Sequence, residues 1–364
     1  MKHFLAFCLF LIIPGIGTNG QMIPADSIHL DKIILPEGYK IELYASGLAN
    51  ARQMDFSDDG TLFVGSSDAG RIYAVTDDRK VIIIDKGLEM PAGVDFFQGT
   101  LYVADVSRIL KYDSILYHLE TNPKPVVVNG YFPKDQGLGY KFIRVGPDNK
   151  LYIPVNSTCN VCVPDSLWHA RILRMSLDGM LLEIFAEGVR SSMGFDWDPV
   201  KRDMWFTDNG KDNRNDTLPP DELNTAITFG QHFGFPYLFG AKPDEKFWPQ
   251  RPYGKGFVNP RYELDAHAGA QGMRFYTGKM FGEKYRGGIF IAEHGTTGNN
   301  IRSGHRITFV PVKTGRPMGY EVFCSGWLDG DHAWGTPADV QVGPDGSLFI
   351  SDDTAGCIYR IYKD

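Results

Sequence analysis

The chain alternates short apolar runs with tight turns rich in Asp, Gly and Pro, and long amphipathic helices are scarce. In FSDDGTLFVGSSDAGRIYAVT and VGPDGSLFISDDTAGCIYRIY, a DDG or PDG turn leads into a strand, and a polar loop and a further strand follow. That further strand alternates apolar with charged residues, as expected for a sheet with one buried face. The pattern therefore predicts an all-β protein built from antiparallel strands.

The same unit occurs six times, at a spacing of roughly 40 to 60 residues that is typical of propeller blades. The units lie at residues 56–76, 96–113, 145–176, 197–210, 285–312 and 342–362. A fourth strand is visible in two of them, at 80–87 and 181–188. We therefore expect a six-bladed β-propeller.

The last unit ends at residue 362 with no fourth strand of its own. The apolar segment YKIELYASG, residues 39–47, precedes the first unit and matches the missing strand. We expect this N-terminal strand to complete the last blade, because closing the ring in this way removes the open sheet edges.

This topology places two sets of segments on one face of the ring. When strands run from the axis outward, the segment leading into each first strand lies on the same side as the loop between the second and third strands. The leading segments are 48–56, 88–96, 137–145, 189–197, 269–276 and 334–342. The longest loops are NSTCNVCVPDSLWHA, DNGKDNRNDTLPPDELN and EHGTTGNNIRSG. We expect the functional site at this face, called the mouth of the axial channel.

Composition narrows the classes of partner. The 364 residues are 43% hydrophobic and 22% charged, and the formal net charge is −7. Nucleic acids and anionic membranes require clustered Lys and Arg, so the charge argues against both. No stretch reaches the roughly 18 to 20 apolar residues of a transmembrane helix. A small neutral or cationic molecule is the partner that this composition accommodates most easily.

Residues 1–20 have the pattern of a secretory signal peptide, with Lys2 and His3 before an apolar run at 4–13 and small residues at 15–20. Cys8 lies inside this segment. The propeller is expected to span residues 21–364. An exported chain of this kind is expected to be periplasmic or secreted.

Removal of the signal leaves four cysteines, and an exported chain can oxidise them. Cys159 and Cys162, in CNVC, are close enough to form a local disulfide, which we expect here. Half of a zinc site or a redox centre are the alternatives, but no second CxxC or HxxxH supplies further ligands. Cys324 and Cys357 form a second bridge or remain buried thiols, and the sequence leaves both open.

The segment 188–236 is the richest in groups that can do chemistry. Arg190 leads into the fourth blade, where it either grips an anionic ligand or pairs with an aspartate such as Asp208 or Asp212. The Asp and Asn residues of DNGKDNRND supply the oxygen ligands that calcium prefers, although such loops are also common as solvated turns. Asp221 and Glu222 are expected to anchor the loop through main-chain hydrogen bonds.

At GVRSSMGFDW, DNGKD, PPDELN and GQHFGFP, together with KFIRVGPDNKLYIPV, CNVC, IAEHG and DVQVGPDGSLFISDDTAGCIYRI, the chain resembles the glucose/sorbosone dehydrogenase family. The resemblance covers essentially everything after the signal. It implies a soluble six-bladed quinoprotein that oxidises a sugar or sugar aldehyde, of the aldose or sorbosone type. It also implies hydride transfer to pyrroloquinoline quinone (PQQ) held over calcium, and an electron acceptor that the sequence does not identify.

Carried over position by position, the resemblance matches in part. Arg190 stands where the family has a quinone-binding arginine, and Ser191 replaces the asparagine beside it. Main-chain carbonyls of Gly210 and Lys211 fall where calcium is held. Thr336 stands where a cofactor-binding arginine is usual.

The catalytic base is the main departure from the family. Leu138 occupies the position expected for the family's base histidine, and no histidine lies within ten residues of it. His294, in EHG, is the substitute base that remains near the mouth.

Three functions follow from this pattern. The first is an exported PQQ-dependent sugar oxidoreductase. The second is a catalytically degenerate propeller that binds carbohydrate or another partner without redox turnover, motivated by Leu138, Ser191 and Thr336. The third, calcium-dependent hydrolysis of a lactone, needs a cage of carboxylates in the axial channel, and the leading segments contain few of them.

Overall fold

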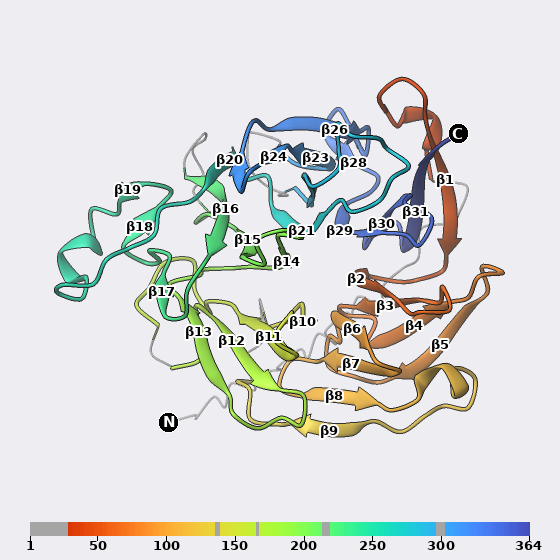
Figure 1. Ribbon diagram of the computed structural model, residues 1–364, viewed down its shortest axis with the longest axis horizontal. Helices are drawn as coiled ribbons and strands as arrows, with labels where there is room; N and C mark the ends of the chain where they lie inside the picture. The colour runs from red at the N-terminus through yellow and green to blue at the C-terminus, as the bar shows by residue number, and fades with distance from the viewer. Residues whose placement is uncertain (1–27, 135–138, 165–166, 213–218, 296–302) are drawn as a thin grey trace, which may run out of the picture.

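The computed structural model describes residues 28–134, 139–164, 167–212, 219–295 and 303–364. Within these residues, six sheets of four or five strands form a ring around a central axis (Figure 1). The predicted six-bladed β-propeller is therefore confirmed. The predicted signal peptide, residues 1–20, lies outside the described residues.

Four antiparallel strands form the main part of each blade, with the first of them nearest the axis (Figure 1). Blade one contains β2 (Ala51–Phe56), β3 (Leu62–Ser66), β4 (Arg71–Val75) and β5 (Val81–Lys86). Blade two contains β6 (Gly93–Phe97), β7 (Thr100–Ala104), β8 (Ile109–Tyr112) and β9 (Val126–Asn129). Blade three contains β10 (Arg144–Val145), β11 (Lys150–Val155), β12 (Arg171–Ser176) and β13 (Glu183–Glu187). Blade four contains β14 (Phe195–Trp197), β15 (Met204–Asp208), β16 (Pro220–Ala226) and β20 (Tyr262–Ala266). Blade five contains β21 (Ala270–Phe275), β22 (Ile289–Glu293), β23 (Arg306–Val310) and β26 (Glu321–Ser325). Blade six contains β29 (Pro337–Val342), β30 (Leu348–Asp352), β31 (Cys357–Lys363) and β1 (Tyr39–Ser46).

Shorter elements lie in the connections between these strands. They are β17 (Gln231–His232), β18 (Leu238–Phe239), β19 (Lys242–Pro243), β24 (Val312–Lys313), β25 (Arg316–Pro317), β27 (Leu328–Asp329), β28 (His332–Ala333) and the 3-10 turns η2 (Leu30–Lys32), η3 (Ile115–Tyr117) and η4 (Trp248–Gln250). None of the helical elements in the described ranges is long and apolar enough to cross a membrane.

The N-terminal strand closes the ring as predicted. β1 pairs antiparallel with β31, from Tyr39 opposite Lys363 to Ser46 opposite Cys357. Figure 1 shows the red β1 beside the dark blue β31. Since β31 would otherwise present an open edge, this pairing joins the two ends of the described chain in one sheet.

The core lies between the blades, because alternate residues of each strand face the neighbouring sheet. Among the described residues, six large buried apolar clusters lie mainly between adjacent blades, and a seventh, smaller one contains Ala170, Phe235 and Phe239. The cluster between blades five and six contains Tyr276, Phe281, Phe290, Phe309 and Phe323, whose rings pack in edge-to-face and stacked pairs. The fold therefore depends on contacts between blades as much as on pairing within them.

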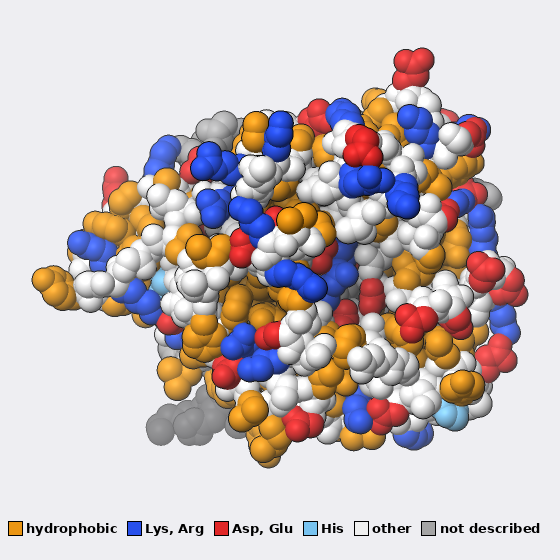
Figure 2. All heavy atoms as spheres, in the orientation of Figure 1, with side chains coloured by type: hydrophobic (Ala, Val, Ile, Leu, Met, Phe, Trp, Pro, Cys, Tyr) orange, Lys and Arg blue, Asp and Glu red, His pale blue; other side chains and the backbone are white. Residues whose placement is uncertain are grey.

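Aspartates on the first strands connect neighbouring blades around the axis. Carboxylate oxygens of Asp55, Asp95, Asp196 and Asp339 accept the main-chain N–H groups of residues on the next blade at 2.8–3.0 Å. Basic and acidic side chains meet in the hollow at the centre of the face in Figure 2. All four aspartates lie in the predicted leading segments, and their carboxylates hold neighbouring blades together. Among the described residues, no group of three His, Cys, Asp or Glu is arranged to hold a metal ion.

One prediction of a loop boundary is wrong. The segment PPDELN is expected in the loop after β15, but β16 begins at Pro220, so Asp221 and Glu222 lie within a strand. After β16 the chain leaves blade four, and β17 pairs in parallel with β13 of blade three before β20 returns to blade four. A residue of this strand therefore contacts the following blade: Asp221 Oδ2 accepts the main-chain N–H of Ala270 at 3.0 Å.

Cys324 and Cys357 are buried thiols in the same apolar cluster. Burial raises the pKa of both thiols well above its ordinary value. The sequence does not decide whether these two cysteines form a second disulfide. In the structure they are free thiols that pack in the core.

Candidate functional site

A cavity of about 130 Å³ opens at the predicted mouth. It is lined by leading segments of blades three, four and five and by the loops that follow β15 and β22. The lining residues are Tyr140, Arg190, Ser191, Met193, Asn209, Gly210, Asp212, Asp221, His267, Gly269, Gln271 and Gly295. The expected placement of leading segments and loops on one face is confirmed by this lining, which we call the mouth cavity.

Arg190 lies in the wall of the mouth cavity with its side chain only 6% exposed. Its Nε and Nη2 atoms donate to the carbonyl oxygen and the side-chain oxygen of Asn160, both at 3.0 Å. Nη1 donates to the carbonyl oxygen of Asn209 at 3.2 Å, and Nη2 lies 3.5 Å from Asp212 Oδ2. The guanidinium therefore joins the Asn160 loop to the segment after β15.

The main chain beside Arg190 is fixed by Asp208. The N–H groups of Arg190 and Ser191 donate to the two carboxylate oxygens of Asp208 at 2.9 and 2.6 Å. Burial raises the pKa of Asp208 to about 6, although these two hydrogen bonds act in the opposite direction. Asp208 thus anchors the segment that carries Arg190 and Ser191, and both of its oxygens are engaged by the main chain.

Gly210 and Lys211 lie in the loop from which calcium-binding carbonyls are predicted. The Gly210 N–H donates to Asp221 Oδ1 at 2.9 Å, and a Cβ at Gly210 would lie 2.6 Å from the Pro220 carbonyl oxygen. The Lys211 side chain turns toward the excursion after β16, where Nζ lies 2.6 Å from Asp244 Oδ2. The structure places Gly210 in the cavity wall, whereas the Lys211 side chain pairs with Asp244 and anchors the loop.

His294 and Thr336 meet in a separate hydrogen-bonded cluster. Nε2 of His294 lies 3.0 and 3.1 Å from the two carboxylate oxygens of Asp353, and the Thr336 hydroxyl donates to the same carboxylate. Arg52 Nη2 lies 2.5 Å from Asp353. Burial alone would raise the pKa of Asp353, but Arg52 and His294 hold it well below its ordinary value. His294 is thus engaged by a carboxylate beside the cavity, and its neighbour Gly295 is the residue that lines it.

The position expected for the family's base, Leu138, lies outside the described residues. Its neighbour Tyr140 does line the mouth cavity, and the Arg52 guanidinium lies 4.8 Å from the centre of its ring. Arg52 also donates to Gln271 Oε1 at 2.7 Å. Arg52, in the first blade, therefore contacts side chains of the third, fifth and sixth blades.

The sequence profile of a family described as "Domain of unknown function (DUF7133)" matches residues 25–359. The chain belongs to this family. An uncharacterised protein of Borreliella burgdorferi is 33% identical over 379 residues, and the match covers all of both chains.

Solved structures share the fold of this DUF7133 member. The holo form of the pyranose dehydrogenase PQQ domain from Coprinopsis cinerea aligns with a TM-score of 0.76 at 14% identity, covering 91% of this chain and 97% of that one. A carbohydrate-active enzyme of family AA12 from Trichoderma reesei gives 0.73 at 19% identity, with 91% and 98% covered. The PQQ-bound aldose sugar dehydrogenase from Streptomyces coelicolor gives 0.66 at 19% identity, with 91% and 100% covered. At the level of the fold, the resemblance to quinoprotein sugar dehydrogenases is confirmed.

Two titratable residues of the mouth cavity are missed by the sequence reasoning. His267 lies in the connection that leads into β21, and Asp221 lies in β16. Asp221 accepts the N–H groups of Gly210 and Ala270 at 2.9 and 3.0 Å, so its predicted anchoring role is confirmed. Burial raises its pKa to about 7. The signal that would have revealed both residues is their position directly before a leading segment or after a mouth loop.

A larger groove, of about 570 Å³, lies elsewhere between blades four and five. It is bounded by the β14–β15 turn, which contains Asp198 and Lys201, and by the β24–β25 hairpin. Its lining contains none of the predicted site residues. The smaller mouth cavity, with its convergent polar groups, is therefore the better candidate site.

Proposed function

We propose that this chain is a sugar oxidoreductase that works at the mouth cavity with PQQ and calcium. The observation that carries the proposal is that Arg190, Ser191 and Gly210, the positions that the family resemblance assigns to quinone and calcium, line one cavity. The shared fold with a PQQ-bound aldose sugar dehydrogenase supports it. The proposed substrate is an aldose or a sugar aldehyde of the sorbosone type, and the electron acceptor is a separate partner.

The donor chemistry of the mouth cavity suits both groups. The Arg190 fork matches carboxylate and quinone oxygens, and the Ser191 hydroxyl adds a donor beside it. Carbonyl oxygens of Gly210 and Lys211 and the Asp212 carboxylate, whose side chain is 70% exposed, are ligands of the kind that calcium prefers. Thr336 acts through Asp353, to which it donates.

When bound, PQQ supplies the acceptor for a hydride from the sugar carbon. The chain's own task is then to hold the sugar and to take the hydroxyl proton. We assign the proton to a carboxylate oxygen of Asp221, because this group lines the mouth cavity and its pKa of about 7 leaves the carboxylate populated above neutral pH. His294 is the alternative acceptor, through the imidazole that Asp353 orients.

We also propose export of the chain to the periplasm or the exterior. The Cys159–Cys162 disulfide supports this location, because such bonds persist in oxidising compartments. The signal-like pattern of residues 1–20 agrees with it.

The experiment is reconstitution of the purified chain with PQQ and calcium, followed by aldoses and sorbosone with an artificial electron acceptor. We expect bound quinone absorbance and sugar-dependent turnover. Arg190→Ala should weaken quinone binding about 10- to 100-fold, because a hydrogen bond to a charged group is worth about 1.5–3 kcal/mol. Asn259→Ala, an exposed change outside the cavity lining, is the matched control.

Two outcomes separate the functional classes. Neither quinone binding nor turnover would contradict the oxidoreductase. Sugar binding measured by calorimetry in the same preparation, with no quinone bound, would favour the propeller that binds carbohydrate without redox chemistry.

A further inference from the structure

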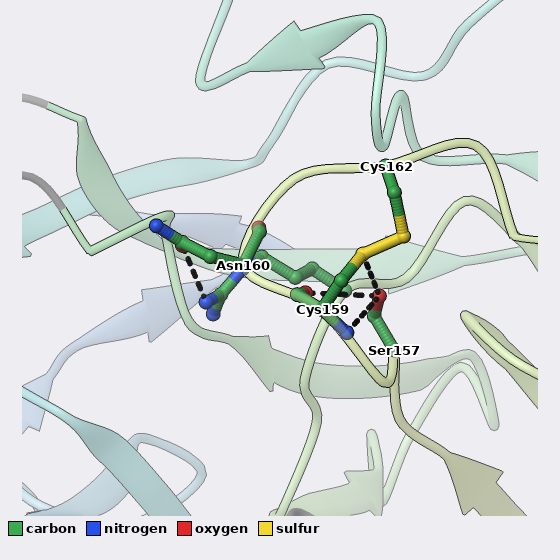
Figure 3. The surroundings of a disulfide bond; sticks show 5 residues. Ser157, Cys159, Asn160 and Cys162 are labelled. Atoms are coloured by element: carbon green, nitrogen blue, oxygen red, sulfur yellow. Dashed lines mark hydrogen bonds between the residues drawn. A yellow bond between two sulfur atoms is a disulfide. The ribbon is translucent and has the colours of Figure 1, made fainter. Parts of the chain in front are cut away.

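The loop between β11 and β12 crosses from blade three to the wall of the mouth cavity in blade four. It carries the predicted Cys159–Cys162 disulfide, which the structure confirms (Figure 3). The Ser157 hydroxyl contacts the Cys159 sulfur at 3.3 Å and its carbonyl oxygen at 3.1 Å. The Ser157 N–H donates to the Arg190 carbonyl oxygen at 2.8 Å, so the base of the loop is joined to the Arg190 segment.

Asn160, inside the disulfide-closed turn, makes the contacts that reach the cavity wall. Its Oδ1 accepts from Arg190 Nη2 at 3.0 Å and from the Asp212 N–H at 2.8 Å. Its Nδ2 donates to the Asp212 carbonyl oxygen at 2.8 Å, and its main-chain carbonyl accepts from Arg190 Nε at 3.0 Å. One residue therefore orients both the guanidinium of Arg190 and the main chain of Asp212.

These contacts depend on the conformation of a short surface turn. Asn160 and Thr158 are exposed, whereas the partly buried Cys159 and Val161 pack against a small apolar cluster of Ala170, Phe235 and Phe239. A covalent link between Cys159 and Cys162 restricts the conformations of the two residues between them. The disulfide, together with the small apolar cluster, therefore holds Asn160 against Arg190.

We propose that Asn160, locked by the Cys159–Cys162 disulfide, is the positioning residue for Arg190 and Asp212 at the mouth cavity, and that reduction of this disulfide releases both. The reductant is a dithiol, which supplies two electrons and two protons. The Cys159–Cys162 bond breaks, two thiols form, and the dithiol closes to its own disulfide. The functional consequence of this release rests on the proposed function, because a released Arg190 guanidinium would bind an anionic cofactor differently.

The test measures the reactivity of Arg190 in the full chain without quinone or sugar. A 1,2-dicarbonyl reagent that modifies arginine is added to the oxidised protein and to protein treated with dithiothreitol, and labelling is followed by peptide mass spectrometry. Arg316, which is exposed, reports the activity of the reagent, and Arg274, 2% exposed, reports global unfolding. Alkylation of Cys159 and Cys162 verifies the reduction.

We expect Arg190 to be as protected as Arg274 in the oxidised protein. After reduction its labelling should rise about ten-fold or more toward that of Arg316, as for a locally opened segment, while Arg274 stays protected. Asn160→Ala should produce the same rise without reductant, and Asn259→Ala should not.

Continued protection of Arg190 in fully reduced protein, or in Asn160→Ala, would overturn the proposal. Simultaneous labelling of Arg274 after reduction would also overturn it, because the disulfide would then hold the whole fold and not this contact. A protein that passes this test but binds no PQQ would refute the proposed function alone.

Discussion

Gly210, in the wall of the mouth cavity, has little room for a side chain. A Cβ there would lie 2.6 Å from the Pro220 carbonyl oxygen, and the residue's N–H is held by Asp221. Gly210→Ala should therefore displace the loop after β15 and lower the free energy of unfolding by about 1–3 kcal/mol, as for other overpacked positions. Chemical denaturation measures the change.

Gly256→Ala is the matched control for this substitution, because no atom lies within 4 Å of a Cβ at Gly256. Equal stability of the two variants would contradict the steric account of Gly210.

Asp221 makes the stability of the chain depend on pH. Its pKa is about 7 in the folded protein and about 3.8 in the absence of burial, so the folded state keeps a proton that the unfolded state releases. The contribution of this proton is complete below pH about 4 and is lost as the pH rises through about 7. The drop in stability between pH 5 and 8 should be smaller in Asp221→Asn than in the unsubstituted chain, by thermal unfolding.

The same variant separates anchoring from proton transfer. If Asp221 accepts the substrate proton, kcat/KM of the reconstituted enzyme rises with pH through about 7, and Asp221→Asn removes this limb of the profile. An unchanged profile in the variant would place the proton on another group, with His294 the next to test.

At the scale of the element, the aromatic cluster between blades five and six carries a large share of the packing. Phe290 is fully buried and its ring lies within 6.0 Å of Tyr276, Phe281, Phe309 and Phe323. Phe290→Ala should lower the free energy of unfolding by about 3–5 kcal/mol, because a large cavity remains. Phe229→Ala, at a side chain that is 55% exposed, should change it far less.

β1 is the element on which closure depends. Its removal would leave β31 with an open edge of seven residues. A chain that begins after Ser46 should therefore unfold at lower temperature and associate through that edge, as light scattering and calorimetry would detect. A truncated chain that remained monomeric with the same transition would contradict the closing role of β1.

The repeat pattern carries most of the information on the fold. Six copies of a strand and turn unit determine the number of blades, and the missing last strand identifies residues 39–47 as its substitute. The same topology places Arg190, Ser191 and Gly210 on one face, so these three could be predicted to lie together.

The remaining site residues could not be predicted in this way, because their contacts join distant parts of the chain. Arg52 and Gln271 are 219 positions apart, and Asn160 contacts Asp212 across 52. The sequence does not indicate Asp221 as a cavity residue because PDELN resembles a loop, whereas the residue lies near the start of β16, which pairs with β15 from Glu222 onward. Local patterns do not encode which side chain of a neighbouring blade will meet a given loop.

At the scale of the whole molecule, the ring holds the mouth cavity rigidly by contacts that pass from blade to blade. Asp339 of the last blade accepts the N–H of Met54 in the first at 2.9 Å, and β1 joins the ends outside it. Such a closed ring with one polar mouth provides a fixed frame on which loops from several blades can form one site.

The central claim is that this mouth binds PQQ and oxidises a sugar. The most direct measurement is a titration of the calcium-supplemented chain with PQQ, monitored by quinone absorbance and followed by sugar-dependent reduction of the bound quinone under single-turnover conditions. The account predicts saturable binding of one PQQ per chain, weakened in Arg190→Ala, and bleaching of the oxidised quinone when an aldose or sorbosone is added. A folded chain that leaves PQQ free in solution at every concentration of calcium would contradict it.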